Sequence, residues 1–426
     1  MSDLDRTWYD VLGVDRFADA ATIHRAYRRR AMLAHPDRGG SEQAFVEISA
    51  AYEVLSDPDR RRDYDAELAG PQVTHRRRWA TEPREDTGLA DVLWHLPEPT
   101  RTPPVATGGL LITSPPGAVA AVDGRTGRER WRAGLGRSAG ARPGADADVV
   151  AAWTDDGTVH GFDTATGERR WHHRLEEPTG FGLACGRGLV VCARSDHRLD
   201  AFDAQSGRRR WHARLTAPPT TAPVVVGAVD PRARGERGAG TVVVFGGDRV
   251  VHAFDTARGH RRWRQRISGL VDHPPVVVGG VIWFAALDGS VQAMEAGTGA
   301  HLARATAGDT ATGIVVGDDA VHVTVLDDVG PALRCLRLPD LEPDWRVGFD
   351  DLPAPPVRAG SWLTLVLPTG DLATIEAHHG VLVQTSELPS PPSTAAPLAL
   401  PADGVGAEPI AYTDAGSALW AVRQPR

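Results

Sequence analysis

Residues 157–171, GTVHGFDTATGERRW, contain the pattern that decides the fold of most of this chain. Their alternating start predicts a half-buried strand, and the polar turn before the tryptophan predicts a hairpin. The same phrase ends at Trp131, at Trp211 and, after an insertion, at Trp263, and the first three tryptophans are 40 residues apart. A repeat of this length is typical of one four-stranded blade of a β-propeller.

Three positions of the phrase have distinct physical roles in this prediction. The turn aspartate bonds nearby backbone amides, and the glycine after it permits a positive φ. The tryptophan begins the outer strand, fills the gap between adjacent blades and donates its indole N–H to a carbonyl. These positions are Asp123, Gly127, Trp131, Asp163, Gly167, Trp171, Asp203, Gly207, Trp211, Asp255, Gly259 and Trp263. We interpret them as structural rather than catalytic residues.

Later copies of the phrase are less regular, and they affect the expected number of blades. Ala303 and Gln384 replace the tryptophan in two copies, and a copy ending at Trp345 lacks the turn glycine. Near the C-terminus, residues 409–422 supply strands without an outer strand, whereas DVLWHL (residues 91–96) resembles an outer strand without a blade. Joining the two ends closes the ring and hides its edges. We therefore expect eight blades, with seven as the fallback.

The first 68 residues have a different pattern, which predicts helices. Asp19 is a good N-cap for a helix that Pro36 ends near residue 34. A second helix begins near Ser41 and places Phe45, Ile48, Tyr52 and Leu55 on one face. The two apolar faces predict an antiparallel helical hairpin, and a short first helix with Tyr9 and Leu12 covers its end.

This segment resembles the J domain of the DnaJ family. The words that match are WYDVLGV (residues 8–14), AYRRRAMLAHPD (residues 26–37) and AYEVLSDPDRRRDYD (residues 51–65). The resemblance implies that the loop of His35, Pro36 and Asp37 docks on a DnaK-type chaperone and stimulates its ATPase. It also implies that the basic face of the preceding helix steers the encounter, through Arg25, Arg28 and Arg29.

Two positions depart from the family pattern. Arg30 stands where an apolar residue usually faces the hairpin, and Ala34 stands where a larger residue is common. Both are expected to thin the hairpin core. The chain also lacks a Gly/Phe-rich stretch and a repeated CxxCxGxG zinc module, so we expect another part of the chain to handle clients.

The propeller phrase resembles the tryptophan-docking motif of pyrroloquinoline-quinone-type propellers, which include enzymes and non-enzymatic assembly proteins. The enzymes need a calcium ion and a catalytic aspartate, and no cluster in the sequence assigns them. The histidine pairs at 172–173 and 378–379 have no metal-binding spacing. We therefore expect no catalytic residues, no metal and no cofactor, and we interpret the basic residues after the first docking tryptophans as a solvated rim.

Composition sets the remaining expectations. The formal net charge is −8, so bulk electrostatics give no reason to expect nucleic-acid binding, and all 47 basic residues are arginines. No apolar run is long enough to span a membrane and no secretory signal is evident, which favours the cytoplasm. The cysteines Cys185, Cys192 and Cys335 fit no paired framework; the first two either face each other across a hairpin or, as we favour, are small core residues.

The sequence thus predicts a multidomain protein of α plus all-β class. Residues 1–68 form the J domain, residues 69–90 a linker and residues 91–426 the propeller. The leading hypothesis is a co-chaperone, not an enzyme, whose propeller binds a client or tethers the J domain to a site. The alternatives are a quinone-type propeller enzyme regulated by chaperone recruitment and a sensor that binds a small ligand in the propeller channel.

Overall fold

The computed structural model describes residues 8–12, 26–27, 30–31, 42–56, 60, 92–96, 102–140, 142–175, 181–227, 240–387, 398–399, 410–415 and 418–423. The chain divides into two compact units, Met1–Thr74 and His75–Arg426. The linker expected at residues 69–90 lies outside the described residues. Each unit is described separately.

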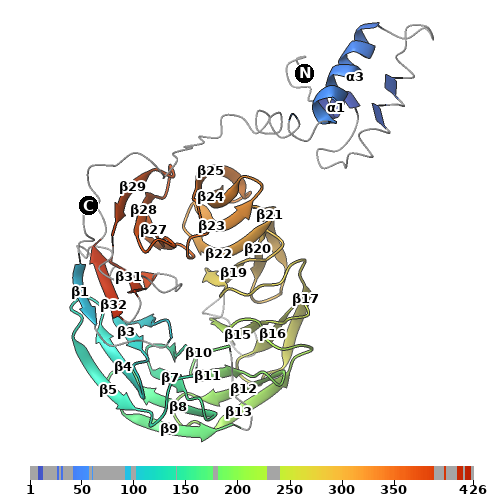
Figure 1. Cartoon of the computed structure of the whole chain (residues 1–426). Helices are drawn as coiled ribbons and strands as arrows, with labels where there is room; N and C mark the ends of the chain where they lie inside the picture. The colour runs from blue at the N-terminus through green and yellow to red at the C-terminus, as the bar shows by residue number, and fades with distance from the viewer. Residues whose placement is uncertain are drawn as a thin grey trace. The chain divides into compact units, whose positions relative to one another are not determined.

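The first unit is helical (Figure 1). Its helices are α1 (Trp8–Leu12) and α3 (Glu42–Leu55), and residues 26, 27, 30 and 31 are also helical. The helix predicted to start near Ser41 is therefore confirmed. Burial of apolar side chains holds α1 against α3, through a cluster of Val11, Leu12, Ile48, Ala51 and Leu55.

The second unit consists of antiparallel four-stranded sheets arranged around a centre (Figure 1). Seven of these sheets are blades of four consecutive strands, and they are numbered here in chain order. Blades 1 to 4 comprise β2 (Val105–Thr107), β3 (Leu110–Thr113), β4 (Ala118–Asp123), β5 (Glu129–Gly134); β6 (Gly144–Ala145), β7 (Val149–Trp153), β8 (Thr158–Asp163), β9 (Arg169–Arg174); β10 (Leu183–Gly186), β11 (Leu189–Ala193), β12 (Arg198–Asp203), β13 (Arg209–Arg214); and β14 (Val224–Val226), β15 (Thr241–Phe245), β16 (Val250–Asp255), β17 (Arg261–Arg266).

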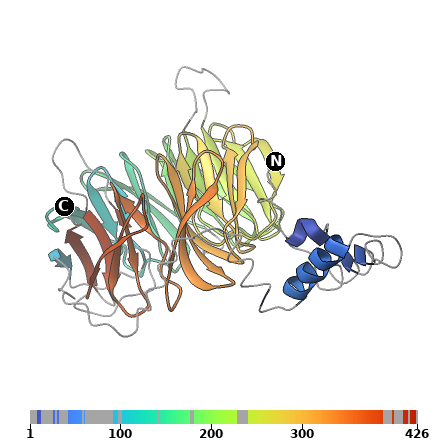
Figure 2. The same ribbon diagram turned by 90° about the horizontal axis from the view of Figure 1, so that it is seen from above.

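Blades 5 to 7 continue the ring, which Figure 2 shows after a turn of 90°. They comprise β18 (Val276–Val278), β19 (Val281–Ala285), β20 (Ser290–Glu295), β21 (His301–Thr306); β22 (Thr310–Val316), β23 (Ala320–Asp327), β24 (Gly330–Arg337), β25 (Glu342–Gly348); and β26 (Val357–Ala359), β27 (Trp362–Val366), β28 (Leu372–Glu376), β29 (Leu382–Ser386).

An additional four-stranded sheet, the composite sheet, joins the two ends of the propeller segment. Its strands are β30 (Leu398–Ala399), β31 (Ile410–Ala415), β32 (Ala418–Arg423) and β1 (Val92–Leu96), and β1 pairs with β32 as the sequence predicted. In this sheet Val92 lies opposite Val422 and Leu96 opposite Leu419. The described residues therefore form seven blades of consecutive strands and one sheet made from both ends.

The core of the propeller lies between neighbouring sheets. The second strands of blades 2, 3 and 4 (β7, β11 and β15) are buried along their whole length, because both of their faces contact adjacent blades. The third strands are nearly as buried, whereas the outer strands alternate between exposed and buried residues. Valine and alanine dominate the inner strands because β-branched and small side chains fit a sheet buried on both faces.

Candidate functional site

All six residues expected to contact a chaperone lie outside the described residues. These residues are His35, Pro36, Asp37, Arg25, Arg28 and Arg29. The described residues do include helical positions on either side of the predicted loop, at 26–27, 30–31 and 42–55. The structure therefore describes the support of the predicted loop, and its docking role remains a prediction.

Two side-chain contacts tie the helical segments of the first unit together. The rings of Tyr27 and Tyr52 stack with their centroids 4.1 Å apart, which joins the helical segment before the loop to α3. The guanidinium of Arg30 donates a hydrogen bond of 2.7 Å to the carbonyl of Val11 in α1. Carbonyls in the last turn of a helix lack an intrahelical partner, so Arg30 satisfies one of them. Sequence reasoning treated Arg30 only as a loss of apolar contact and missed this bond; Ala34 lies outside the described residues.

In the propeller, the predicted tryptophans dock on the next blade along the chain. The indole N–H of Trp131 donates to the carbonyl of Thr164 at 2.9 Å, and Trp171 donates to Ala204 at the same distance. Trp211, Trp263 and Trp345 donate in the same way to Thr256, Ala296 and Ala377. The acceptor is always the residue after the turn carboxylate of the next blade. The expected indole-to-carbonyl bond is present at each of these positions.

The turn glycine matters because the incoming indole lies directly against it. Gly207 has a φ of 67°, and a Cβ on it would be 2.5 Å from the ring of Trp171. Gly127, Gly167 and Gly259 also have positive φ, and each faces a docking indole in the same way. A side chain at this position would be strained and would also displace the ring. Glycine is therefore required on the receiving blade, not on the blade that supplies the tryptophan.

The turn aspartates bond their own turns, as expected. Asp163 accepts hydrogen bonds from the backbone N–H groups of Ala165 and Thr166 at 2.9 and 2.8 Å, and it pairs with Arg170. Asp123, Asp203 and Asp255 accept equivalent backbone bonds. The bond from the Ser206 backbone N–H is the main cause that lowers the pKa of Asp203 to about 2. The bonds of these carboxylates to their own turns support a structural role.

Two junctions between sheets lack a docking tryptophan, and at each one the receiving partner also lacks the glycine turn. Ala303 of blade 5 faces blade 6, whose last turn contains Leu338 and Leu341 in place of the motif. Leu341 is buried, and Leu338 packs against the same cluster as Ala303. Gln384 of blade 7 precedes the composite sheet, in which the third and fourth strands come from opposite ends of the chain. The loss of the tryptophan and the loss of its acceptor therefore coincide.

One docking tryptophan was missed by the sequence reasoning. The indole N–H of Trp94 in β1 donates to the carbonyl of Gly124 at 3.2 Å, and its ring lies against Gly127. The composite sheet therefore contacts blade 1 through the same motif that joins the other blades. The word DVLWHL (residues 91–96) contained this residue, but its own aspartate and glycine turn is absent from that end of the chain.

The remaining cysteines and histidines form no metal site in the described part of the chain. All three cysteines are free, and Cys185 lies opposite Val190 and Cys192 opposite Leu183, so they do not face each other directly. No group of three or more His, Cys, Asp or Glu side chains in the described residues could hold a metal ion. The calcium site that the resemblance to quinone enzymes implies therefore finds no donor set among these residues.

Together, the fold and the contacts define a helical segment of J-domain type joined to a propeller with docked tryptophans. A model of the DnaJ domain matches residues 7–65. A model described as outer membrane protein assembly factor BamB matches residues 115–237 and 232–329, about half of the chain. The chain belongs to this BamB-type propeller family, and it carries a DnaJ domain at its N-terminus.

Curated relatives match the DnaJ domain alone. The chaperone protein DnaJ of Salinibacter ruber is 52% identical over 66 residues, which is 15% of this chain and 17% of the relative. DnaJ of Thermosynechococcus vestitus is 54% identical over 63 residues, 14% of this chain and 17% of that relative. The chain thus spans about one sixth of the length of these relatives.

Solved structures match the propeller fold. BamB from Moraxella catarrhalis superposes with a TM-score of 0.60 and 17% identity, covering 79% of this chain and all of that chain. A quinohemoprotein alcohol dehydrogenase from Comamonas testosteroni superposes with a TM-score of 0.55 and 14% identity, covering 80% of this chain and 77% of that chain. Identities this low establish the fold alone. In the part of the chain that the structure describes, no helix is long and apolar enough to cross a membrane.

Proposed function

We propose that this protein is a J-domain co-chaperone that stimulates ATP hydrolysis by a DnaK-type chaperone through His35, Pro36 and Asp37. The observation that carries the proposal is the match of residues 7–65 to the DnaJ domain, with more than half of the residues identical to bacterial DnaJ proteins. The proposed loop lies inside this matched stretch. The stacking of Tyr27 on Tyr52 of α3 supports the predicted helical hairpin.

In this proposal the loop residues have separate roles. Asp37 offers a carboxylate to an arginine of the chaperone, and such charge-assisted pairs are about twice as strong as neutral hydrogen bonds. Pro36 restricts the loop so that His35 and Asp37 point outward. Arg25, Arg28 and Arg29 attract an acidic surface of the chaperone and raise the rate of encounter. Since this mechanism consumes ATP, we propose the cytoplasm as its compartment, which agrees with three free cysteines.

The propeller serves in this proposal as a binding module for a client or a docking protein. A tether of this kind raises the local concentration of the J domain at one site without any new contact to the chaperone. We also propose that the composite sheet acts as an eighth blade that closes the ring. Two observations support closure: Trp94 docks on blade 1, and β30 contacts both β2 and β26. Closure leaves the propeller without an open sheet edge.

Binding to the chaperone tests the proposed function. The full chain is immobilised, and a DnaK-type chaperone is passed over it with ATP or with ADP. We expect binding with ATP, and we expect its loss for the Asp37→Asn variant. The Asp309→Asn variant is the matched control, because Asp309 is an exposed propeller carboxylate with no side-chain bond in the structure. Equal binding by the wild type and the Asp37→Asn variant would contradict the role of the loop.

A further inference from the structure

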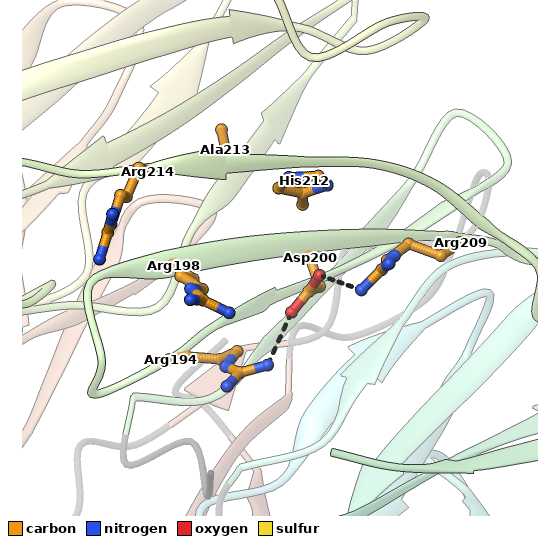
Figure 3. A pocket seen from close by; sticks show the side chains of 7 residues that line it. All are labelled: Arg194, Arg198, Asp200, Arg209, His212, Ala213 and Arg214. Carbon is orange, nitrogen blue, oxygen red and sulfur yellow. Dashed lines mark hydrogen bonds and ion pairs between the residues drawn. The ribbon is translucent and has the colours of Figure 1, made fainter. Parts of the chain in front are cut away.

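One face of blade 3 contains an arginine-lined cavity of about 410 Å³ (Figure 3). The register of the sheet places Arg198 opposite Arg214 and Asp200 opposite His212 on this face. Phe202 lies on the same face and its ring stacks on Trp171, so the face looks toward blade 2. Arg194, from the turn after β11, and Arg209, from β13, complete the polar lining.

The charges in this cavity are organised around one buried carboxylate. The side chain of Asp200 is 2% exposed, and it contacts Arg194 at 3.2 Å and Arg209 at 3.5 Å. Arg194 is also buried and pairs with Asp196 at 2.8 Å, while Arg198 lies 3.6 Å from the same carboxylate. Three arginines therefore meet two carboxylates, which leaves an excess of positive charge.

Two of the lining side chains have no anionic partner in the described residues. Arg214 and His212 are exposed at the mouth of the cavity, and no carboxylate of the described chain bonds either of them. Asp200 thus orients two guanidinium groups without neutralising the site. Guanidinium groups fixed in this way recognise carboxylate or phosphate oxygens through paired hydrogen bonds.

Comparison among the blades shows that the fold does not require these charges. Asp200 lies on the third strand of its blade. The equivalent residue is His160 in blade 2, His252 in blade 4 and Gln292 in blade 5. The position of Arg194, which starts the turn after the second strand, is Thr154 in blade 2 and Gly246 in blade 4. A buried ion pair costs desolvation energy and is weak evidence of a role in stability. The pair in blade 3 therefore points to binding.

Basic side chains extend the site on both sides. The outer strands of blades 2 and 4 expose Arg169, His172, Arg174, Arg261, Arg264 and Arg266, at positions equivalent to those of β13. The outer strands of blades 5 to 7 contain far fewer cations. Among the outer strands of blades 2 to 7, the exposed cations are thus concentrated on blades 2, 3 and 4.

We propose that this basic surface, centred on the cavity of blade 3, binds an acidic segment of a partner protein. An aspartate or glutamate side chain enters the cavity beside Arg198, and flanking acidic residues contact Arg209, Arg214 and the outer strands of blades 2 and 4. The inference names the chemistry of the partner and rests on the proposed role of the propeller as a binding module. It is independent of the J-domain loop.

Two observations favour an acidic polypeptide over a nucleic acid. A single-stranded nucleic acid binds best where exposed aromatic rings stack on its bases. The tryptophans of β9 and β13 are instead buried against the next blade, with 7% and 6% exposure. The cavity also suits one or two side chains, and the net negative charge of the chain opposes a long polyanion that extends beyond the basic blades.

Fluorescence anisotropy tests this proposal with the full chain. The probes are a labelled peptide of alternating glutamate and glycine, the same peptide with glutamine, and a single-stranded oligonucleotide of equal charge. One variant, Arg194→Thr with Asp200→His, installs the residues of blade 2, which folds with them. A second variant, Arg209→Gln with Arg214→Gln, removes exposed cations alone. Arg337→Gln on blade 6 is the control, because it removes a surface arginine far from the cavity in sequence.

We expect the glutamate peptide to bind wild-type protein and the control, and the glutamine peptide not to bind. Each double variant should weaken binding by about tenfold or more, because the first removes the carboxylate that orients Arg209 and the second removes two cations that pair with the peptide. Equal binding by both double variants and wild type would overturn the proposal, and so would tighter binding of the oligonucleotide than of the peptide. Absence of peptide binding would also overturn it, and would leave the proposed action on the chaperone ATPase standing.

Discussion

Replacement of Trp171 by alanine is the perturbation whose effect follows most directly from the structure. The ring is 7% exposed and lies in a narrow slot between blades 2 and 3. A Cβ on Gly161 would be 2.2 Å from the ring, and one on Gly207 would be 2.5 Å from it. The ring also stacks on Phe202 with a centroid distance of 6.1 Å. Alanine would leave this slot empty.

The expected loss of stability has two parts. Removal of a buried tryptophan side chain typically costs about 3–5 kcal/mol, because apolar contact is lost and a cavity remains. The carbonyl of Ala204 also loses the indole N–H that lies 2.9 Å away, and an unsatisfied buried carbonyl costs about 1–3 kcal/mol. The two parts overlap in measured substitutions, so we expect the Trp171→Ala variant to lose about 4–6 kcal/mol.

Equilibrium unfolding in urea, followed by circular dichroism, measures this loss. The Trp171→Phe variant is the matched comparison, because it keeps one aromatic ring in the slot while it removes the N–H donor and the second ring of the indole. It should lose less than the alanine variant. If Trp171→Ala changes the unfolding free energy by no more than about 0.5 kcal/mol, as at exposed sites, the docking account of the propeller is wrong.

Two further predictions concern other junctions between blades. Burial lowers the pKa of His322 to about 4, whereas in the unfolded chain the imidazole binds a proton near pH 6.5, so the free energy of unfolding should fall by about 1–2 kcal/mol between pH 7 and pH 5. Urea unfolding of the wild type and of the His322→Gln variant at both pH values checks this. The same loss of stability in the variant as in the wild type would count against it. Ala303→Trp should not stabilise the propeller, because blade 6 offers Leu341 where other blades offer glycine; a higher melting temperature for this variant would contradict that reasoning.

Most of the propeller could be predicted from the sequence because its repeat is local. One phrase contains the strand, the turn aspartate, the glycine and the tryptophan, so the spacing of Trp131, Trp171 and Trp211 sets the size of a blade. The pairing of β1 with β32 was also predictable, because each end supplied the part that the other lacked. The start of α3 followed from its apolar periodicity.

The features that were missed depend on contacts between distant segments. Trp94 could not be identified as a docking residue, because the aspartate and glycine turn that precedes the other docking tryptophans does not precede it in the sequence. The basic residues of the outer strands of the first two blades were interpreted as a solvated rim, and the sequence does not show that Asp200 in blade 3 gathers Arg194 and Arg209 around a cavity. The bond from Arg30 to Val11 likewise joins residues 19 positions apart. In each case the missing information was register or packing, not residue type.

Single-turnover ATP hydrolysis by a DnaK-type chaperone tests the central claim most directly. The chaperone is loaded with labelled ATP, and the rate of hydrolysis is measured alone, with the full chain, and with its Asp37→Asn variant. The account predicts that the wild type accelerates hydrolysis and that the variant leaves it at the basal rate, while Asp309→Asn behaves as wild type. Equal acceleration by the wild type and the Asp37→Asn variant, or none by either, would contradict it.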